Sequence, residues 1–104
     1  MKRVLRYTVG VSDEAYEVPR GVPVLFGRSR SHSAPGFEGL LDIWFEITVL
    51  GHDWNPVEYN PPKQWVRVVG TAHPIPDEWR WLASFNDDGR VWHLYGVPDA
   101  HVAP

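Results

Sequence analysis

The stretch LLDIWFEITVL, residues 40–50, decides the fold because its apolar and polar residues alternate one by one. Successive side chains of a strand point to opposite faces, whereas a helix would place apolar residues three or four apart. One face would carry Leu41, Ile43, Phe45, Ile47 and Val49, and the other Asp42, Trp44, Glu46 and Thr48. The stretch therefore predicts a strand with one face in a hydrophobic core.

Shorter segments with the same alternation flank this strand and predict further strands. They cover residues 4–11, 15–18, 22–26 and 65–69. The tetrapeptide VPRG, residues 18–21, separates the second of these segments from the third. Proline at its second position and glycine at its fourth predict a type I turn.

The C-terminal third has the pattern of a β-hairpin. Residues 79–86 and 91–97 are rich in aromatic and β-branched side chains, and Asp88-Gly89 between them suits a two-residue turn with positive φ. The predicted register pairs Phe85 with Trp92, Ala83 with Leu94, Ser84 with His93 and Leu82 with Tyr95. Trp79, Trp81, Ala83 and Phe85 would then share one face by alternation.

A competing interpretation starts a helix at Pro76. Proline at the first helical position, followed by Asp77 and Glu78, is a helix-start signal. The alternation that begins at Trp79 favours the strand instead. A single helical turn over residues 76–79 would satisfy both patterns.

The composition fits one compact domain. The chain has 104 residues, of which 43% are hydrophobic and 22% charged. We predict a single β domain over residues 1–97 and a flexible tail over 98–104. The fold class is all-β, with about seven short, mostly antiparallel strands in a small sandwich or a partly open barrel and at most one short helical turn.

The charge, hydropathy and composition of the sequence argue against several classes of function. The net charge of −3 argues against nucleic-acid binding, and no apolar run is long enough to span a membrane. The N-terminal pattern predicts no signal peptide, and the lack of cysteine fits a reducing cytoplasm. The residues that could coordinate zinc are His52, Asp53, His73, His93 and His101. Their spacing matches no compact zinc motif, so we expect no metal and no cofactor.

The segment GTAHPIP, residues 70–76, interrupts the strands and holds one candidate site. Glycine supplies an unusual backbone angle, and residues before proline favour an extended conformation, so the chain should turn a corner there. Thr71 and His73 could present a hydroxyl and an imidazole to a small ligand. Arg28 and Arg30, from the basic loop 27–39, would grip its phosphates. The structural interpretation, which we favour, is that Thr71 and His73 bond backbone groups left unpaired at the corner.

A tryptophan-rich surface is the second candidate. Trp44 lies on the polar face of residues 40–50, and pairing of 65–69 with that strand would join the two segments in one patch. Tryptophan, tyrosine and arginine dominate interface hot spots. The predicted partner-binding residues are Trp44, Trp65, Arg67, Trp54 and Tyr59. Alternatively, loop 51–64 folds over these tryptophans through Trp54 and Tyr59 as a second small core, and both interpretations stay open.

Residues 2–26 and 66–97 resemble a family of small, uncharacterised proteins encoded by phages and prophages, whose members carry a GTGHPI motif. Thr71, His73, Pro74 and Ile75 match this motif, and Ala72 stands where glycine is usual. VWHLYGV, residues 91–97, matches the terminal strand, with His93 at the family's histidine position. The resemblance implies a phage or prophage origin, expression in the bacterial host cytoplasm, and a small β-rich accessory protein.

The sequence therefore favours a non-enzymatic accessory protein that binds a host or phage protein, with a second copy of the chain as another partner. The alternative is a small-ligand or nucleotide-binding protein, a sponge for a signalling molecule, that uses the corner and the basic loop. An enzyme ranks third, because no catalytic constellation has a convincing spacing.

Overall fold

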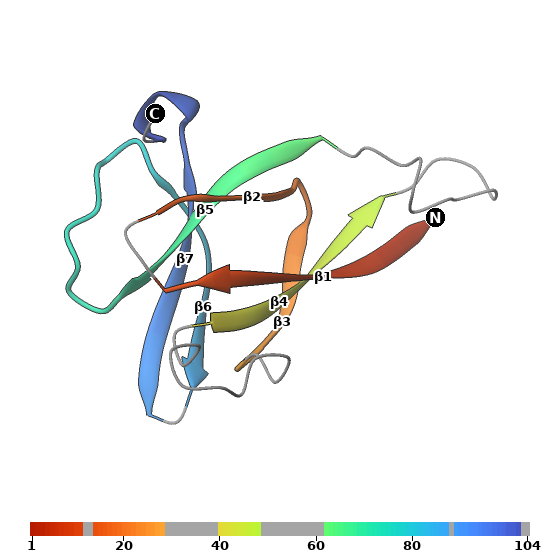
Figure 1. Ribbon diagram of the computed structural model, residues 1–104, viewed down its shortest axis with the longest axis horizontal. Helices are drawn as coiled ribbons and strands as arrows, with labels where there is room; N and C mark the ends of the chain where they lie inside the picture. The colour runs from red at the N-terminus through yellow and green to blue at the C-terminus, as the bar shows by residue number, and fades with distance from the viewer. Residues whose placement is uncertain (12–13, 29–39, 49–61, 88, 103–104) are drawn as a thin grey trace.

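The computed structural model describes residues 1–11, 14–28, 40–48, 62–87 and 89–102, which form two antiparallel sheets (Figure 1). The strands are β1 (Lys2–Gly10), β2 (Tyr16–Pro19), β3 (Val22–Arg28), β4 (Leu40–Thr48), β5 (Lys63–Gly70), β6 (Arg80–Asp87) and β7 (Arg90–Val97), followed by a 3-10 turn, η1 (Asp99–His101). The two sheets do not close into a barrel. The predicted all-β class, with about seven strands and one short helical turn, is confirmed.

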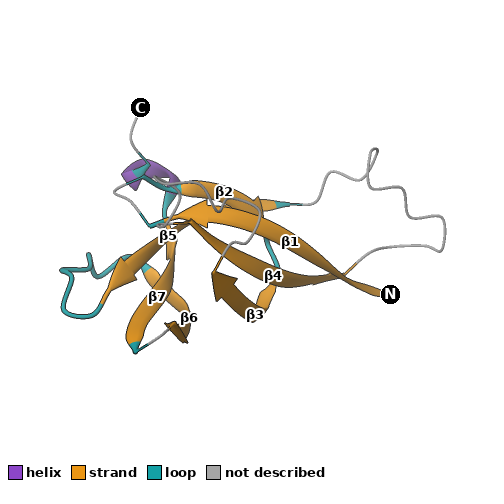
Figure 2. Ribbon diagram, turned by 60° about the horizontal axis from the view of Figure 1, so that its bottom comes forward, coloured by secondary structure: helices purple, strands orange, loops and turns teal. Residues whose placement is uncertain are grey.

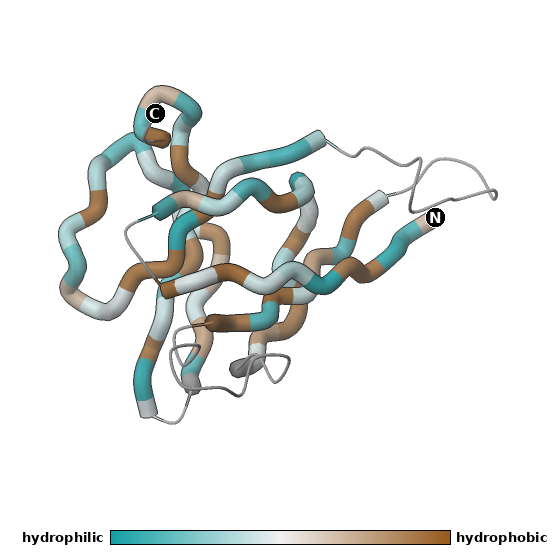
Figure 3. The backbone as a smooth tube through the Cα atoms, in the orientation of Figure 1, coloured by the Kyte–Doolittle hydropathy of each residue, from teal (hydrophilic) through white to brown (hydrophobic). Residues whose placement is uncertain are grey.

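The first sheet has the strand order β1-β4-β3, so residues 40–48 lie at its centre. Ile43 and Phe45 of β4 are fully buried, as the alternation predicts. Figure 3 shows that apolar and polar residues also both occur along β1, although not in strict alternation. Asp42 was predicted on the polar face but is only 4% exposed. The hydroxyl of Thr8, its neighbour on β1, donates a hydrogen bond of 2.7 Å to the Asp42 carboxylate.

The second sheet has the order β2-β5-β7-β6, and it packs on the first sheet through one core (Figure 2). The core consists of Val9, Val18, Leu41, Ile43, Phe45, Val66, Val68 and Leu94. At one edge of the core, Phe26 of β3 stacks on Phe85 of β6. Both sheets contribute aliphatic residues from alternate strand positions, which is how an antiparallel sandwich fills its interior.

The chain passes from the second sheet to the first at residues 18–21, and this connection is not the predicted type I turn. The Gly21 N–H donates to Pro19 O, two residues back, at 2.9 Å, and the Arg20 N–H donates to Pro62 O at 2.8 Å. A Cβ on Gly21 would lie 2.6 Å from Glu46 O. The glycine is therefore needed for the close approach of two backbones rather than for a turn.

The C-terminal hairpin confirms most of the predicted register. Phe85 faces Trp92, Ser84 faces His93 and Ala83 faces Leu94. Gly89 has a φ of 82°, as expected of the turn, and Asp88 lies outside the described residues. The predicted pairing of Leu82 with Tyr95 is wrong, because the register shifts at this point and Trp81 faces Tyr95 instead.

This bulge decides where the aromatic residues of β6 point. An extra residue in one strand reverses the alternation beyond it. Leu82 and Phe85 both pack against the core, and Trp81 is left 57% exposed on the other face of the sheet. Trp81 and Phe85 therefore do not share a face, contrary to the prediction.

The helix that could have started at Pro76 does not form. The Trp79 N–H donates to Pro76 O at 3.1 Å, which closes a turn just before β6 begins. The 3-10 turn instead lies at Asp99–His101, in the segment predicted as a flexible tail. Trp79 Nε1 donates a hydrogen bond of 2.8 Å to His101 Nδ1, so the chain contacts the sheet as far as His101.

No helix in the described ranges is long and apolar enough to cross a membrane.

Candidate functional site

The corner at residues 70–76 is a tight turn followed by an extended segment. The His73 N–H donates to Gly70 O at 3.3 Å, and Ala72 between them has a φ of 70°. Positive φ at the third residue is the signature of a type II turn. The unusual backbone angle that we expected of Gly70 therefore belongs to Ala72, the position at which the family resembled above has glycine.

The two predicted ligand-binding side chains of the corner bond different groups of the protein. His73 Nδ1 lies 2.8 Å from Pro74 O, and its Nε2 lies 3.4 Å from Arg67 Nη2. Because arginine only donates, Nε2 must accept, and the proton of a neutral His73 is on Nδ1. Thr71 instead contacts Val91 O and the ring of His93. The described contacts of Thr71 and His73 match the structural interpretation of the corner more closely than a shared ligand site.

A hydrogen-bonded chain of side chains crosses the outer face of the second sheet next to the corner. Trp81 Nε1 donates to Ser84 Oγ at 2.9 Å, and Ser84 Oγ lies 2.6 Å from His93 Nδ1. His93 Nε2 lies 3.2 Å from Thr71 Oγ1, which donates to Val91 O at 3.5 Å. One arrangement of protons satisfies every member, with a neutral His93 that carries its proton on Nε2.

These hydrogen bonds pair Ser84 with His93, but Ser84 is not arranged as a serine nucleophile would be. A serine nucleophile donates its proton to a histidine that a third group orients, usually a carboxylate. Here the third group is the hydroxyl of Thr71, and the indole of Trp81 donates to the very Ser84 oxygen that would attack. The predicted register already placed Ser84 opposite His93, whereas the bulge that brings Trp81 to them has no signal in the sequence.

A second cluster on this outer face surrounds Arg67. The guanidinium carbon of Arg67 lies 5.5 Å from the centroid of the Trp79 ring, within the range of a cation–π contact. Trp79 in turn bonds His101, so the segment before β6 and the turn η1 both contact the sheet here. Arg67, a predicted partner-binding residue, contacts the side chains of His73 and Trp79 within this chain.

The predicted tryptophan patch is divided between the two sheets. β4 pairs with β1 and β3, and β5 pairs with β2 and β7, so the expected pairing of residues 65–69 with 40–50 is wrong. Trp44 therefore belongs to the first sheet, and Trp65 and Arg67 to the second. Sequence alternation assigns each residue to a face of its own strand but contains no information about the neighbouring strand.

Aliphatic residues that were not among the predicted site residues lie around Trp44. Trp44 faces Arg6 on β1 and Leu25 on β3, and the next outward residue of β4, Glu46, faces Val4 and Val22. Directly opposed residues in an antiparallel pair share a face. Val4, Val22 and Leu25 are 53%, 63% and 56% exposed. We call the surface formed by Val4, Val22, Leu25 and Trp44 the Trp44 face.

For the remaining predicted site residues, the structure describes no side-chain positions. Arg30, Trp54 and Tyr59 lie outside the described residues, as does the side chain of Arg28. Loop 51–64, which was considered as a second small core, is also outside them except for its last three residues, 62–64. Among the residues that are described, no three histidine, aspartate or glutamate side chains are grouped so as to hold a metal ion.

Comparison with known proteins gives a family but no activity. No curated protein and no solved structure matches the chain. A family model, the domain of unknown function DUF7352, matches residues 1–103. This match includes the middle segment 27–64, which the resemblance to the phage and prophage family leaves out. The chain therefore belongs to the DUF7352 family, whose function is unknown.

Proposed function

We propose that this protein is a non-enzymatic accessory protein that binds another protein through the Trp44 face. The observation that carries the proposal is the exposure of three aliphatic side chains, Val4, Val22 and Leu25, around one tryptophan on a single sheet face. Contiguous exposed apolar surface on a soluble domain marks an interaction site, and burying it releases water favourably.

The edge of this face has the polar character of an interface rim. Lys2 and Glu46 form an ion pair at 3.2 Å beside Val4 and Val22, and Arg6 lies opposite Trp44. An apolar centre with charged residues at its border is the usual anatomy of a protein–protein interface. The side-chain chemistry of the outer face of the second sheet is less suited, because the histidines and Arg67 there already bond groups of this chain.

The partner that we propose is a host or phage protein in the bacterial cytoplasm, and the chain itself would be encoded by a phage or prophage. The motif of residues 71–75, matched by Thr71, His73, Pro74 and Ile75, supports this origin. A small ligand held by Thr71 and His73 is the weaker alternative, because it would have to displace the hydrogen bonds that these two side chains make.

The test uses Leu25→Asp, which replaces an exposed apolar side chain at the centre of the Trp44 face with a charged one. The control, Val91→Asp, places the same charge on an exposed position of the second sheet. Proteins captured from a bacterial lysate by the wild type are purified, and their affinity for each variant is measured by calorimetry. We expect Leu25→Asp to weaken binding at least about tenfold and Val91→Asp to leave it unchanged.

Two results would overturn the proposal. One is a purified partner that binds Leu25→Asp as tightly as it binds the wild type. The other is a wild-type chain that captures no protein. A second copy of the chain is the alternative partner, and light scattering after size-exclusion chromatography would reveal it as a dimer that Leu25→Asp dissociates.

A further inference from the structure

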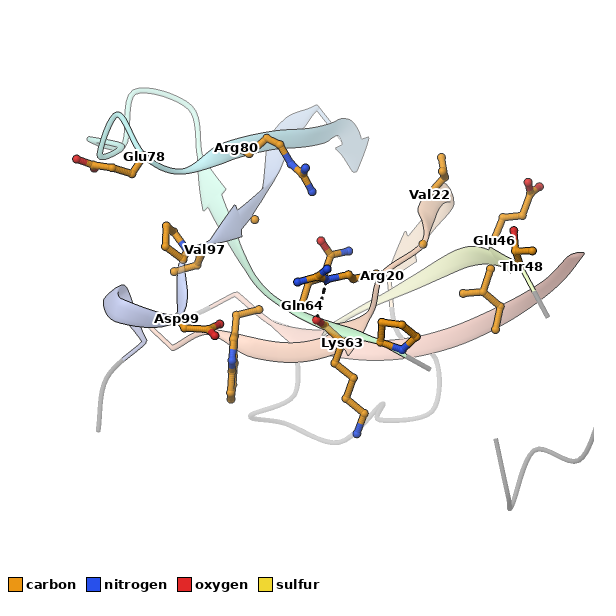
Figure 4. Close-up of a pocket in the computed structure, with 16 residues that line it drawn as sticks. Arg20, Val22, Glu46, Thr48, Lys63, Gln64, Glu78, Arg80, Val97 and Asp99 are labelled. Atoms are coloured by element: carbon orange, nitrogen blue, oxygen red, sulfur yellow. Dashed lines mark hydrogen bonds between the residues drawn. The ribbon is translucent and has the colours of Figure 1, made fainter. Parts of the chain in front are cut away.

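A pocket of about 940 Å³ opens between the two sheets (Figure 4). One wall belongs to the first sheet, with Val22, Glu46 and Thr48. The opposite wall belongs to the second sheet and includes Trp65 and Arg80. Its volume lies within the range of small-molecule sites, which are about 300–1,000 Å³.

Two guanidinium groups extend into this pocket. Figure 4 shows Arg20, beside Gln64, reaching into it from one side, and Arg80 reaching toward them from β6. Arg20 Nε donates to Lys63 O at 3.1 Å, which holds the side chain and leaves its terminal nitrogens to face the pocket. Within the described part of the chain, the guanidinium of Arg80 makes no hydrogen bond and no ion pair.

The acidic residues around the pocket do not neutralise these two arginines. Glu46 is paired with Lys2, and the ammonium of Lys63 is paired with Glu17 at 3.3 Å, so each of these lining charges has an ion-pair partner other than the two arginines. Figure 4 shows Glu78 directed away from the pocket. Asp99, on η1, also lines the pocket but forms no ion pair with either arginine in the described part of the chain. Two positive charges thus face one space from two elements that are far apart in the sequence.

Part of the lining is apolar. The half-buried Trp65 lines the pocket together with Val97 and Pro98. Guanidinium groups bind phosphate or carboxylate through paired, charge-assisted hydrogen bonds. We propose that this pocket binds a small organic anion, with its phosphate or carboxylate held by Arg20 and Arg80 and its apolar part against the apolar residues of the lining. The pocket shares Val22 with the Trp44 face, but its two arginines lie outside that face, and neither proposal depends on the other.

The test is a calorimetric titration of the full chain with phenyl phosphate, benzoate and inorganic phosphate. Phenyl phosphate and benzoate share a ring and differ in the anionic group, whereas inorganic phosphate lacks the ring. We expect phenyl phosphate or benzoate to bind, inorganic phosphate to bind more weakly than phenyl phosphate, and added salt to weaken all binding.

Arg80→Gln is the decisive variant, because this exposed side chain makes no described contact whose loss would disturb folding. Arg90→Gln is the matched control, with the same change of charge on the neighbouring strand, outside the pocket lining. Arg80→Gln should weaken binding about tenfold or more, and Arg90→Gln less than about twofold. Equal losses in both variants, or binding of an acidic peptide but of none of the three probes, would overturn the proposal.

Discussion

The rings of Phe26 and Phe85 stack with their centroids 4.1 Å apart and 5° between their planes. Phe26 belongs to β3, an edge strand of the first sheet, and Phe85 belongs to β6, an edge strand of the second. Both rings pack against the buried core, so this pair closes one side of the sandwich.

Phe85→Ala should therefore destabilise the fold by about 2–4 kcal/mol, somewhat below the cost of a fully buried ring. Chemical denaturation monitored by circular dichroism measures this change. Val91→Ala, at an exposed position of the same hairpin, serves as the control and should change stability by less than about 0.5 kcal/mol. Equal effects of the two variants would show that the stack does not hold the sheets together.

Gly21 and Gly27 form a matched pair for testing the close approach between β3 and β4. A Cβ at position 21 would lie 2.6 Å from Glu46 O and 2.9 Å from Ile47 Cγ2, whereas at position 27 the nearest atom is 3.9 Å away. Gly21→Ala should cost about 1–3 kcal/mol because the backbones must separate. Gly27→Ala should cost less, and the reverse order in thermal denaturation would contradict this geometry.

Ala72 is an alanine in a conformation that suits glycine. Its φ of 70° lies in the left-handed region, which costs an L-residue about 1–2 kcal/mol. Ala72→Gly should raise the free energy of unfolding by up to about 1 kcal/mol, after allowing for the greater freedom of glycine in the unfolded chain. Ala83→Gly, within β6, should instead lower it. A loss of stability in both variants would refute the strained turn.

The three histidines in the described part of the chain, His73, His93 and His101, are predicted to differ in tautomer. His73 should carry its proton on Nδ1, because Arg67 donates to its Nε2. His93 and His101 should carry theirs on Nε2, since Ser84 and Trp79 donate to their Nδ1 atoms. Long-range proton–nitrogen NMR spectra in alkaline buffer distinguish the two forms.

The variant Ser84→Ala tests the direction of the hydrogen bond between Ser84 and His93. It removes the donor to Nδ1 of His93, so the ring should become a mixture of tautomers, and the signals of His73 should not change. The same tautomer for all three histidines in the wild type would show that the proton assignments are wrong.

The local part of the candidate site could be predicted, but its arrangement in space could not. The pairing of Ser84 with His93 follows from the hairpin, because a short turn fixes the register of neighbouring strands. The Trp44 face and the pocket each need strands that are distant in sequence. Leu25 reaches Trp44 across a second bulge, between Pro23 and Leu25, and Arg20 and Arg80 meet at one pocket from opposite ends of the chain.

The sequence by itself determined that this protein is all-β, because alternation of side chains is a local property that each strand expresses wherever it lies. The choice between a sandwich and a partly open barrel came from the structure. It also determined the buried face of β4, with Ile43 and Phe45 in the core. Only the tertiary structure decided that Trp44 and Trp65 belong to different sheets and that Trp81 points outward. The choice of strand neighbours and the placing of a bulge depend on how the two sheets pack together, which no single segment of the chain specifies.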